Sequence, residues 1–474
     1  MRWITVICTA VLIFCGSFGM FTVGKSVSAA QEERIAAKPN IIYIMADDLG
    51  YGDLSSYGQT LFETPRIDSL AKEGLKFTQH YAGCTVCAPS RCALMTGKHT
   101  GHSFIRGNRR APDGFGDWPI APEVVTVAEI LKKHGYTNGL FGKWGLGSHQ
   151  NEGNPLKHGF DEFFGYYSQS DAHNYYPPYL HHNDRKIELD RETYSHDLIA
   201  AEALRFIREN KARPFFCYLP FTIPHAAMQV PEEYVTPWRE KFAEFEDVSA
   251  KYSSADPVKN PVAAFPGMLN KLDETVGNVL DLLKELEIED NTIVIFTSDN
   301  GPHHEGGHRS DLFNSNGPLT GYKRDLTEGG IRVPFLVRWP AKIKQGKQGT
   351  VTGHMSAFWD FFPTVCELVG EPVPEGLDGI SYLPTLLGND SQQKKHDYLY
   401  WEFYEQGGKR AARIGDWKGI QLDVSKNPDG PIAVYHLQYD IAETNDLAKQ
   451  HPEWVERFRK CFEAAHLPSD IFIF

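Results

Sequence analysis

The chain has 474 residues, of which 41% are hydrophobic, 12% aromatic and 23% charged. This balance is typical of a folded globular protein and excludes a collagen, a coiled coil and an intrinsically disordered chain. The formal net charge is −13, from 48 basic and 61 acidic residues. No long basic run occurs, so a nucleic-acid partner is not expected.

The first thirty residues have the pattern of a targeting segment. Arg2 precedes an uncharged, mostly apolar stretch over residues 3–23, and small residues follow Lys25 at positions 28–30. This pattern predicts a cleaved signal peptide over residues 1–30. The alternative is an uncleaved membrane anchor, because the apolar stretch is long enough to span a bilayer. The prediction is an exported protein, periplasmic or secreted (or in a lysosome-type lumen in a eukaryote), without membrane attachment after cleavage.

Buried strands alternate with amphipathic helices along the next part of the chain. Continuous apolar runs of this kind indicate strands buried on both faces, and apolar spacings of three and four indicate helices. The alternation predicts an α/β fold with a doubly wound sheet, in which ligands bind beyond the carboxyl ends of the strands. The predicted strands cover residues 40–46, 136–141, 214–221 and 292–298, and the helices cover 125–134, 195–210 and 267–287.

After about residue 387 the pattern changes. A polar, linker-like stretch over residues 388–395 is followed by short aromatic-rich runs and then by an amphipathic helix. We therefore predict a catalytic domain over residues 36–390 and a smaller C-terminal α+β domain over residues 391–474. The runs, interpreted as antiparallel strands, cover 398–404, 412–422 and 433–439, and the helix covers 453–465.

Six cysteines follow the leader, and three of them fall within nine residues, at 84, 87 and 92. This spacing does not resemble the even distribution of a disulfide-stapled scaffold. Cys84 and Cys87 form a C-x-x-C pair, which by itself fits redox chemistry or half of a zinc site. Neither a second pair nor a thioredoxin-like context supports those interpretations.

The most specific motif is Cys87-Ala88-Pro89-Ser90-Arg91, which is followed at fixed spacing by Leu94, Thr96 and Gly97. One interpretation of this motif is purely structural: a buried cysteine at the start of a helix, with proline in the first turn. The motif resembles the signature of the type I sulfatases, and the chain is most similar to the branch of arylsulfatase A and N-acetylgalactosamine-6-sulfatase. The resemblance runs from residue 39 to about residue 447. It implies an alkaline-phosphatase-like fold with a mixed sheet, and a formylglycine made from Cys87 by a formylglycine-generating or other sulfatase-maturing enzyme.

A formylglycine explains why this motif suits sulfate ester chemistry. A thiol is a poor nucleophile toward sulfate, whereas the hydrate of an aldehyde carries two hydroxyls on one carbon. One hydroxyl attacks sulfur and displaces the alcohol, and the second then loses its proton and expels sulfate as the aldehyde reforms. A helix N-terminus here favours an anion. Arg91, one turn along, is placed to hydrogen-bond the hydrate.

Two acidic pairs follow predicted strands, Asp47-Asp48 and Asp299-Asn300. Each alone fits a turn. Together they offer three carboxylates and an amide oxygen, a hard oxygen site suited to Ca²⁺, with Mg²⁺ as second choice. The resemblance implies the same four ligands, with the residue at Cys87 and the substrate sulfate completing the shell.

Lys143, Lys323 and His225 also follow apolar runs. Lone lysines are usually solvated and lone histidines often structural, but the resemblance implies that both lysines bind sulfate oxygens and that His225 protonates the leaving alcohol. One position departs from the family, since many relatives read K-W-H-L-G where this chain has Gly145. His149 is a possible substitute for that histidine.

Substrate contacts are predicted in two segments. Gln169 and His173 lie in an aromatic and polar stretch over residues 163–178. His304 lies between His303 and His308, and we predict that these three histidines line the entrance (the mouth) of the active site. A zinc site is the alternative for the three mouth histidines. The predicted function is hydrolysis of a sulfate monoester on a carbohydrate or small molecule. The alternatives are a phosphate or phosphonate ester hydrolase of the same superfamily, and a non-enzymatic protein that binds sulfated glycans with Cys87 unconverted.

Overall fold

The computed structural model describes Met1 and residues 38–474 except 113, 115, 344 and 345. Apart from Met1, the predicted signal peptide thus lies outside the described residues. Residues 38–474 form one compact unit. Within the described part of the chain, no helix is long and apolar enough to cross a membrane.

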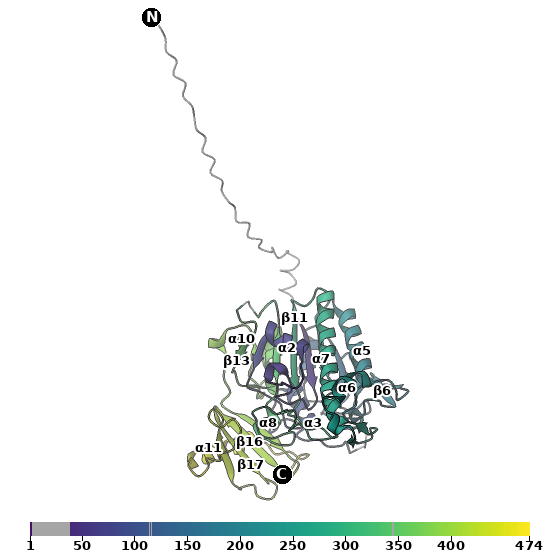
Figure 1. Ribbon diagram of the computed structural model, residues 1–474. Helices are drawn as coiled ribbons and strands as arrows, with labels where there is room; N and C mark the ends of the chain where they lie inside the picture. The colour runs from purple at the N-terminus through teal and green to yellow at the C-terminus, as the bar shows by residue number, and fades with distance from the viewer. Residues whose placement is uncertain (2–37, 113, 115, 344–345) are drawn as a thin grey trace. The chain divides into compact units, whose positions relative to one another are not determined.

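A ten-stranded mixed sheet forms the centre of this unit, with the order β13-β2-β12-β11-β1-β8-β4-β5-β6-β7 (Figure 1). Its five middle strands, from β11 to β5, are parallel, and antiparallel pairings occur on both sides of them. This confirms the predicted doubly wound mixed sheet. The middle strands are β11 (Thr292–Ser298), β1 (Asn40–Ala46), β8 (Phe215–Pro220), β4 (Thr137–Lys143) and β5 (Glu162–Tyr166). The outer strands are β13 (Thr350–Thr352), β2 (Leu75–Phe77), β12 (Phe335–Arg338), β6 (Tyr179–His182) and β7 (Arg185–Glu188).

Helices cover both faces of the sheet because its middle strands are apolar on both sides. Alternate side chains of β1 enter two separate cores, Ile42 and Ile44 in one, Tyr43 and Met45 in the other. The first core contains side chains of α2 (Pro65–Glu73), α5 (Ser195–Asn210), α6 (Glu232–Arg239) and α7 (Pro261–Glu285). The second contains side chains of α3 (Cys87–Thr96), α4 (Val127–Lys133), α9 (Phe361–Val369) and α10 (Leu383–Leu386).

Helix α5 matches its predicted range, whereas α7 begins six residues before the predicted start. Asn260 caps α7 by accepting the Ala263 N–H, and Pro261 occupies the first turn, where no N–H is needed. Pro266 lies inside the helix, where proline is disfavoured because it has no N–H for the helical hydrogen bond. A Cβ at Gly267 would lie 2.7 Å from the Tyr234 carbonyl oxygen, so this glycine permits the close approach of α6. Tertiary packing therefore extends this helix beyond its sequence signal.

Five short elements and six 3₁₀ turns complete this part of the fold. Two short strand pairs and one helical turn lie in its connections: β3 (His80–Tyr81) with β14 (Ser356–Ala357), β9 (Ser249–Ala250) with β10 (Val258–Lys259), and α8 (Glu328–Ile331). The 3₁₀ turns are Ser55–Tyr57, Pro155–Lys157, Asp171–His173, Ala243–Phe245, Phe358–Asp360 and Asp390–Gln392.

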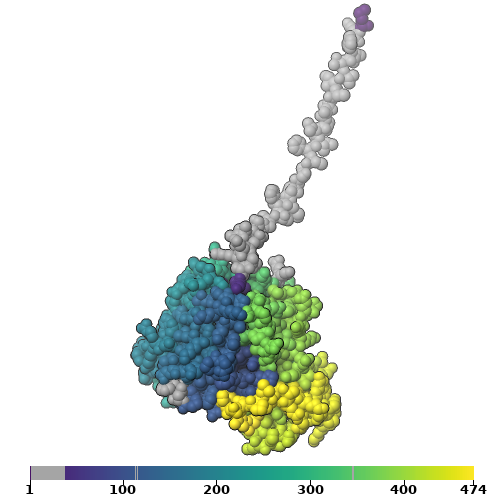
Figure 2. Space-filling view, turned by 180° about the vertical axis from the view of Figure 1, so that it is seen from behind, coloured from purple at the N-terminus to yellow at the C-terminus, as the bar shows by residue number. Residues whose placement is uncertain are grey.

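A second, four-stranded antiparallel sheet follows near the C-terminus, formed by β15 (Leu399–Phe403), β16 (Lys409–Ile414), β17 (Trp417–Leu422) and β18 (Ile432–His436). The run predicted as one strand over 412–422 is two strands, which reverse at Gly415 with φ +59°. One face of this sheet packs on α11 (Pro452–Ala465), and Trp401 on the other face donates its indole N–H to the Ala82 carbonyl at 2.9 Å. The C-terminal residues, yellow in Figure 2, thus pack against the first part of the unit. The domain boundary at 390/391 stays a prediction.

Candidate active site

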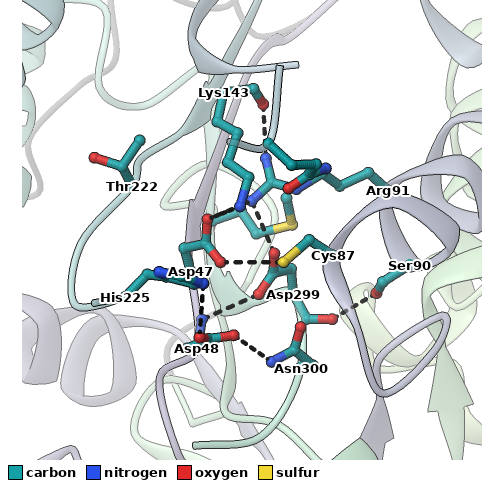
Figure 3. A network of polar contacts seen from close by, with 12 residues as sticks. Asp47, Asp48, Cys87, Ser90, Arg91, Lys143, Thr222, His225, Asp299 and Asn300 are labelled. Carbon is teal, nitrogen blue, oxygen red and sulfur yellow. Dashed lines mark hydrogen bonds and ion pairs between the residues drawn. The ribbon is translucent and has the colours of Figure 1, made fainter. Parts of the chain in front are cut away.

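The register of β1 and β11 brings the two predicted acidic pairs together. Ala46 pairs with Ser298, so the residues that follow both strands meet at one edge of the sheet. The Asp48 N–H donates to Asp299 Oδ1 at 3.1 Å, and Asn300 Nδ2 donates to Asp48 Oδ1 at 2.7 Å (Figure 3). Asp47, Asp48, Asp299 and Asn300 are all buried. Buried, crowded carboxylates are costly unless they are paired or bind a cation.

The donor set of this cluster fits a hard cation. Asn300 Oδ1 is buried and has no hydrogen-bond partner. Ligand atoms of Asp47, Asp48, Cys87 and His225 all lie within 4.8 Å of one another. Burial and the neighbouring Asp47 carboxylate raise the pKa of Asp299 to about 6. Burial acts in the same direction on Asp47, but the charges of Lys143 and Arg91 outweigh it and hold the pKa of that carboxyl well below its usual value.

Cys87 is the first residue of α3, and its sulfur lies 3.5 Å from Asp47 Oδ1. Pro89 is compatible with the first helical turn because no intrahelical N–H is required there. Ser90 Oγ donates to the Asp299 carbonyl at 2.5 Å and accepts the Gly83 N–H at 3.0 Å, which ties α3 to the acidic edge. Burial and Asp47 raise the pKa of Cys87, so the unmodified thiol stays protonated.

Arg91 and Lys143 neutralise part of the carboxylate charge. Arg91 Nη2 donates to Asp299 Oδ2 at 2.8 Å and to Asp47 Oδ2 at 3.3 Å, while Nη1 donates to the Lys143 carbonyl at 2.6 Å. Lys143 is the last residue of β4, so its side chain extends past the strand end, and Nζ lies 2.5 Å from Asp47 Oδ2. Both cations are buried and therefore held in place.

Lys323 and His225 complete the other side of the cluster. Lys323 Nζ donates to Asp48 Oδ2 at 2.8 Å and lies 2.9 Å from His225 Nε2. His225 Nδ1 contacts the carbonyl of Ala226, which makes Nδ1 the ring donor and leaves the Nε2 lone pair to accept from Lys323. Burial and the Lys323 charge hold the pKa of His225 well below its ordinary value, so the imidazole is neutral.

Of the four remaining predicted site residues, which are His149, Gln169, His173 and His304, two lie at or next to this cluster. The ring of His173 stacks on His225 with centroids 4.6 Å apart. Gln169 fills the space beside Gly145, because a Cβ at that glycine would lie 2.0 Å from Gln169 Nε2. Both polar atoms of the Gln169 amide are buried without a partner. An amide therefore occupies the volume that a side chain at position 145 would take.

The contacts of His149 and His304 lie elsewhere. His149 packs against the rings of Tyr167 and His181, and the exposed His304 hydrogen-bonds Ser310 at 2.6 Å. Of the mouth histidines, His303 is the one whose ring lies next to His225, at 5.6 Å. Among the residues that the structure describes, the three mouth histidines do not form one metal-binding group. The six described cysteines are all buried and unpaired, as their spacing predicts.

Sequence reasoning missed Tyr252, Glu305 and Arg324, which lie beside Lys323 and His225. Glu305 Oε2 is 3.7 Å from Lys323 Nζ, and Glu305 Oε1 is 2.8 Å from Arg324 Nη2. Glu305 and Arg324 adjoin motif residues in the sequence, and that adjacency was the available signal. Tyr252 carries no sequence signal because only the fold brings its loop to the site.

Comparison with known proteins identifies the family. The model of the sulfatase family matches residues 39–371, more than half of the chain. The chain belongs to the sulfatase family. A second model, for the C-terminal part of N-sulphoglucosamine sulphohydrolase, matches residues 321–456. The chain is therefore an enzyme, and the interpretation as a non-catalytic binding protein is not supported.

Individual relatives agree with this assignment. The chain is 31% identical to an N-acetylgalactosamine-6-O-sulfatase of Bacteroides thetaiotaomicron, with 90% of this chain and 93% of the relative covered. It is 32% identical to the N-acetylgalactosamine-6-sulfatase of Canis lupus familiaris, over 88% and 83% of the two chains. The solved structure of Ps i-CgsB in complex with k-i-k-neocarrahexaose matches with a TM-score of 0.74 and 28% identity, over 90% and 93% of the chains. The phosphonate monoester hydrolase of Agrobacterium radiobacter, at 20% identity, shares the fold (TM-score 0.65, 90% and 95% covered).

Proposed function

We propose that this sulfatase hydrolyses a sulfate monoester on a carbohydrate, with a formylglycine derived from Cys87 as nucleophile and a divalent cation in the acidic cluster. The observation that carries the proposal is the position of Cys87, at the start of α3 and 3.5 Å from Asp47. Arg91 and Lys143 contact Asp47, and Lys323 contacts the adjacent Asp48. The single negative charge of a sulfate monoester group is stabilised there by Arg91, Lys143 and Lys323. The named substrates of the relatives suggest N-acetylgalactosamine 6-sulfate as the first compound to test.

The residues that would hold the cation are Asp47, Asp48, Asp299 and Asn300. Asn300 Oδ1 is buried without a hydrogen-bond partner, as expected for an oxygen that binds a cation. Ca²⁺ is the first choice and Mg²⁺ the second, because all four donors are hard oxygens. When bound, the cation supplies positive charge that polarises the sulfate group. Removal of metal by a chelator is expected to abolish turnover, and Ca²⁺ is expected to restore it. Full activity after verified metal removal would contradict this assignment.

The side chains divide the remaining work. A hydroxyl of a formylglycine hydrate at position 87 would lose its proton to a neighbouring carboxylate, such as Asp47, and form a bond to sulfur as the bond from sulfur to the sugar oxygen breaks. The leaving oxygen would take the proton that Lys323 Nζ and His225 Nε2 share across 2.9 Å. Arg91 keeps Asp47 and Asp299 in position through its two hydrogen bonds. The second hydroxyl of the hydrate must lose its proton when sulfate is expelled and the aldehyde reforms. Many relatives have a histidine at the position of Gly145, whereas here the amide of Gln169 lies beside this glycine. The group that accepts this proton is therefore not a histidine at position 145.

Maturation and export form part of the same proposal. Cys87 is only 2% exposed, so a formylglycine-generating or other maturing enzyme reaches it before the chain folds. The sequence pattern of residues 1–30 supports export to a periplasmic or extracellular compartment.

Mass spectrometry tests the nucleophile directly. Trypsin releases residues 77–91 as one peptide, which carries both Cys84 and Cys87. We expect an aldehyde at Cys87 in protein from its native compartment, while Cys84 remains a thiol and serves as the internal control. A thiol at both positions in active enzyme would refute the proposed nucleophile.

Kinetics test the reaction class. Matched aryl sulfate and aryl phosphate esters differ in the transferred group alone, so their kcat/KM values compare the two activities directly. We expect the sulfate ester to be preferred. A preference for phosphate would instead favour the phosphate or phosphonate ester hydrolase.

A further inference from the structure

Burial decreases outward from His225 along one side of the site. The side chains of Asp48 and His225 are 0% and 1% exposed, whereas those of Glu305 and Arg324 are 22% and 31% exposed. Glu305 Oε2 lies 3.7 Å from Lys323 Nζ, and its other oxygen lies 2.8 Å from Arg324 Nη2. The Glu305–Arg324 ion pair therefore forms an outer wall directly beside the residues proposed to serve the leaving oxygen.

The backbone of Arg324 is held in an unfavourable conformation. Its φ is +77°, in the left-handed region that residues other than glycine seldom adopt. The Arg324 N–H donates to the Thr85 carbonyl at 3.1 Å, and its carbonyl accepts from Lys409 Nζ at 2.7 Å. Contacts from two distant segments thus maintain the strain, as is typical of positions where side-chain placement matters.

Tyr252 joins this wall to the catalytic histidine. Its hydroxyl donates to Glu305 Oε2 at 3.2 Å, and its ring lies edge-on to His225 and His173 at 5.6 and 5.1 Å. An aromatic ring beside a few charged hydrogen-bonding groups is a common composition for a small-ligand site. It suits a sugar, which presents both apolar C–H groups and hydroxyls.

We propose that Glu305 and Arg324 bind neighbouring hydroxyls of the sugar that carries the scissile sulfate. This inference rests on the proposed function. Because the leaving oxygen must approach His225, the sugar ring lies on the side of the site formed by Tyr252 and the ion pair. A carboxylate accepts hydrogen bonds only and a guanidinium donates them only, so the pair matches two adjacent hydroxyls, each of which can do both.

The charge of the wall also limits which sugars fit. The side chain of Glu305 is 22% exposed and carries a carboxylate that only accepts hydrogen bonds. A second sulfate placed against Glu305 would meet its negative charge, so this carboxylate selects sugars with a free hydroxyl at that position.

Two substrates separate sugar recognition from chemistry. N-acetylgalactosamine 6-sulfate offers ring hydroxyls, and 4-nitrophenyl sulfate has none. The variant Arg324→Gly removes the guanidinium and suits the positive φ, so it is expected to fold. We expect the ratio of kcat/KM for the sugar to kcat/KM for the aryl ester to fall about 10- to 100-fold, as for the loss of hydrogen bonds to a charged group. Most of that change is expected in KM.

A matched control and a second variant complete the test. Arg309→Ala removes an arginine from the same loop whose ion pair with Asp311 is exposed, and it should leave both rates unchanged. Glu305→Gln keeps the shape and removes the charge, so activity on a disulfated sugar relative to its monosulfated parent is expected to rise. An unchanged sugar-to-aryl ratio in Arg324→Gly would overturn the inference while the sulfatase activity stands. If the unaltered enzyme cleaves neither ester, the proposed function fails and this inference fails with it.

Discussion

Lys418 offers a sharp test of how burial controls the strength of an ion pair. It lies on β17, is fully buried, and contacts Glu328 Oε1 and Glu443 Oε1, each at 2.9 Å. Glu328 belongs to α8, so this pair fastens the C-terminal sheet to the segment that follows Lys323. The substitution Lys418→Met keeps most of the volume and leaves the two carboxylates without their shared cation.

The expected cost is about 3–5 kcal/mol in the free energy of unfolding, because a buried charge loses its partner. Burial, opposed by Lys418, raises the pKa of Glu443 to about 7, so this carboxyl can take up a proton below that pH. The penalty of Lys418→Met should therefore be larger at pH 8 than at pH 5.5. In the unaltered chain Lys418, together with Arg332 and Arg413, outweighs the effect of burial and lowers the pKa of Glu328 to about 2, so Glu328 is ionised at both pH values. The two arginines remain beside Glu328 in the variant.

Urea unfolding at both pH values provides the measurement, and Lys347→Met provides the control. Lys347 contacts Asp390 at the same 2.9 Å, but the two side chains are 43% and 61% exposed. Its removal should cost at most about 1 kcal/mol, because solvent screens an exposed pair. Equal costs for the two substitutions would refute the argument that burial, rather than distance, sets the penalty.

Two further predictions follow from the structure. Burial raises the pKa of Asp53 to about 7, so its contribution to stability is complete below its unfolded pKa of about 4 and is lost as the pH rises through 7. Asp53→Asn should therefore reduce the loss of stability between pH 5.5 and pH 8 in urea melts, and an unchanged loss would contradict the assignment. Gly145→Ala should cost about 1–2 kcal/mol, because φ is +76°, and should lower kcat/KM by displacing Gln169. Gln169→Ala removes the clash, so the double variant should unfold at a urea concentration above that expected from adding the two single effects; strict additivity would show that the two residues do not compete for space.

Local sequence patterns were sufficient for the parts of the site that lie within a few residues of one another. The Cys87 motif predicted a helix start, and the polar pairs after 40–46 and 292–298 predicted ligands at strand ends. The structure confirms the helix start, and the parallel register of β1 and β11 brings the two polar pairs together at one edge of the sheet. That these pairs bind a cation stays a prediction. The family resemblance added Lys143, His225 and Lys323, and the structure brings them into the same cluster.

The remaining features depended on contacts between distant segments. The sequence could not show that Gln169 fills the space beside Gly145, because their proximity comes from the parallel pairing of β4 with β5. It also missed Tyr252 and the Glu305–Arg324 pair, since a charged or aromatic residue in a loop is usually solvated and only burial distinguishes these. The sequence by itself thus determined which residue types begin α3 and follow the strands β1 and β11, because these groups lie at fixed spacings within short segments. The tertiary structure decided which other side chains join them, because that depends on how separate loops pack over one edge of the sheet.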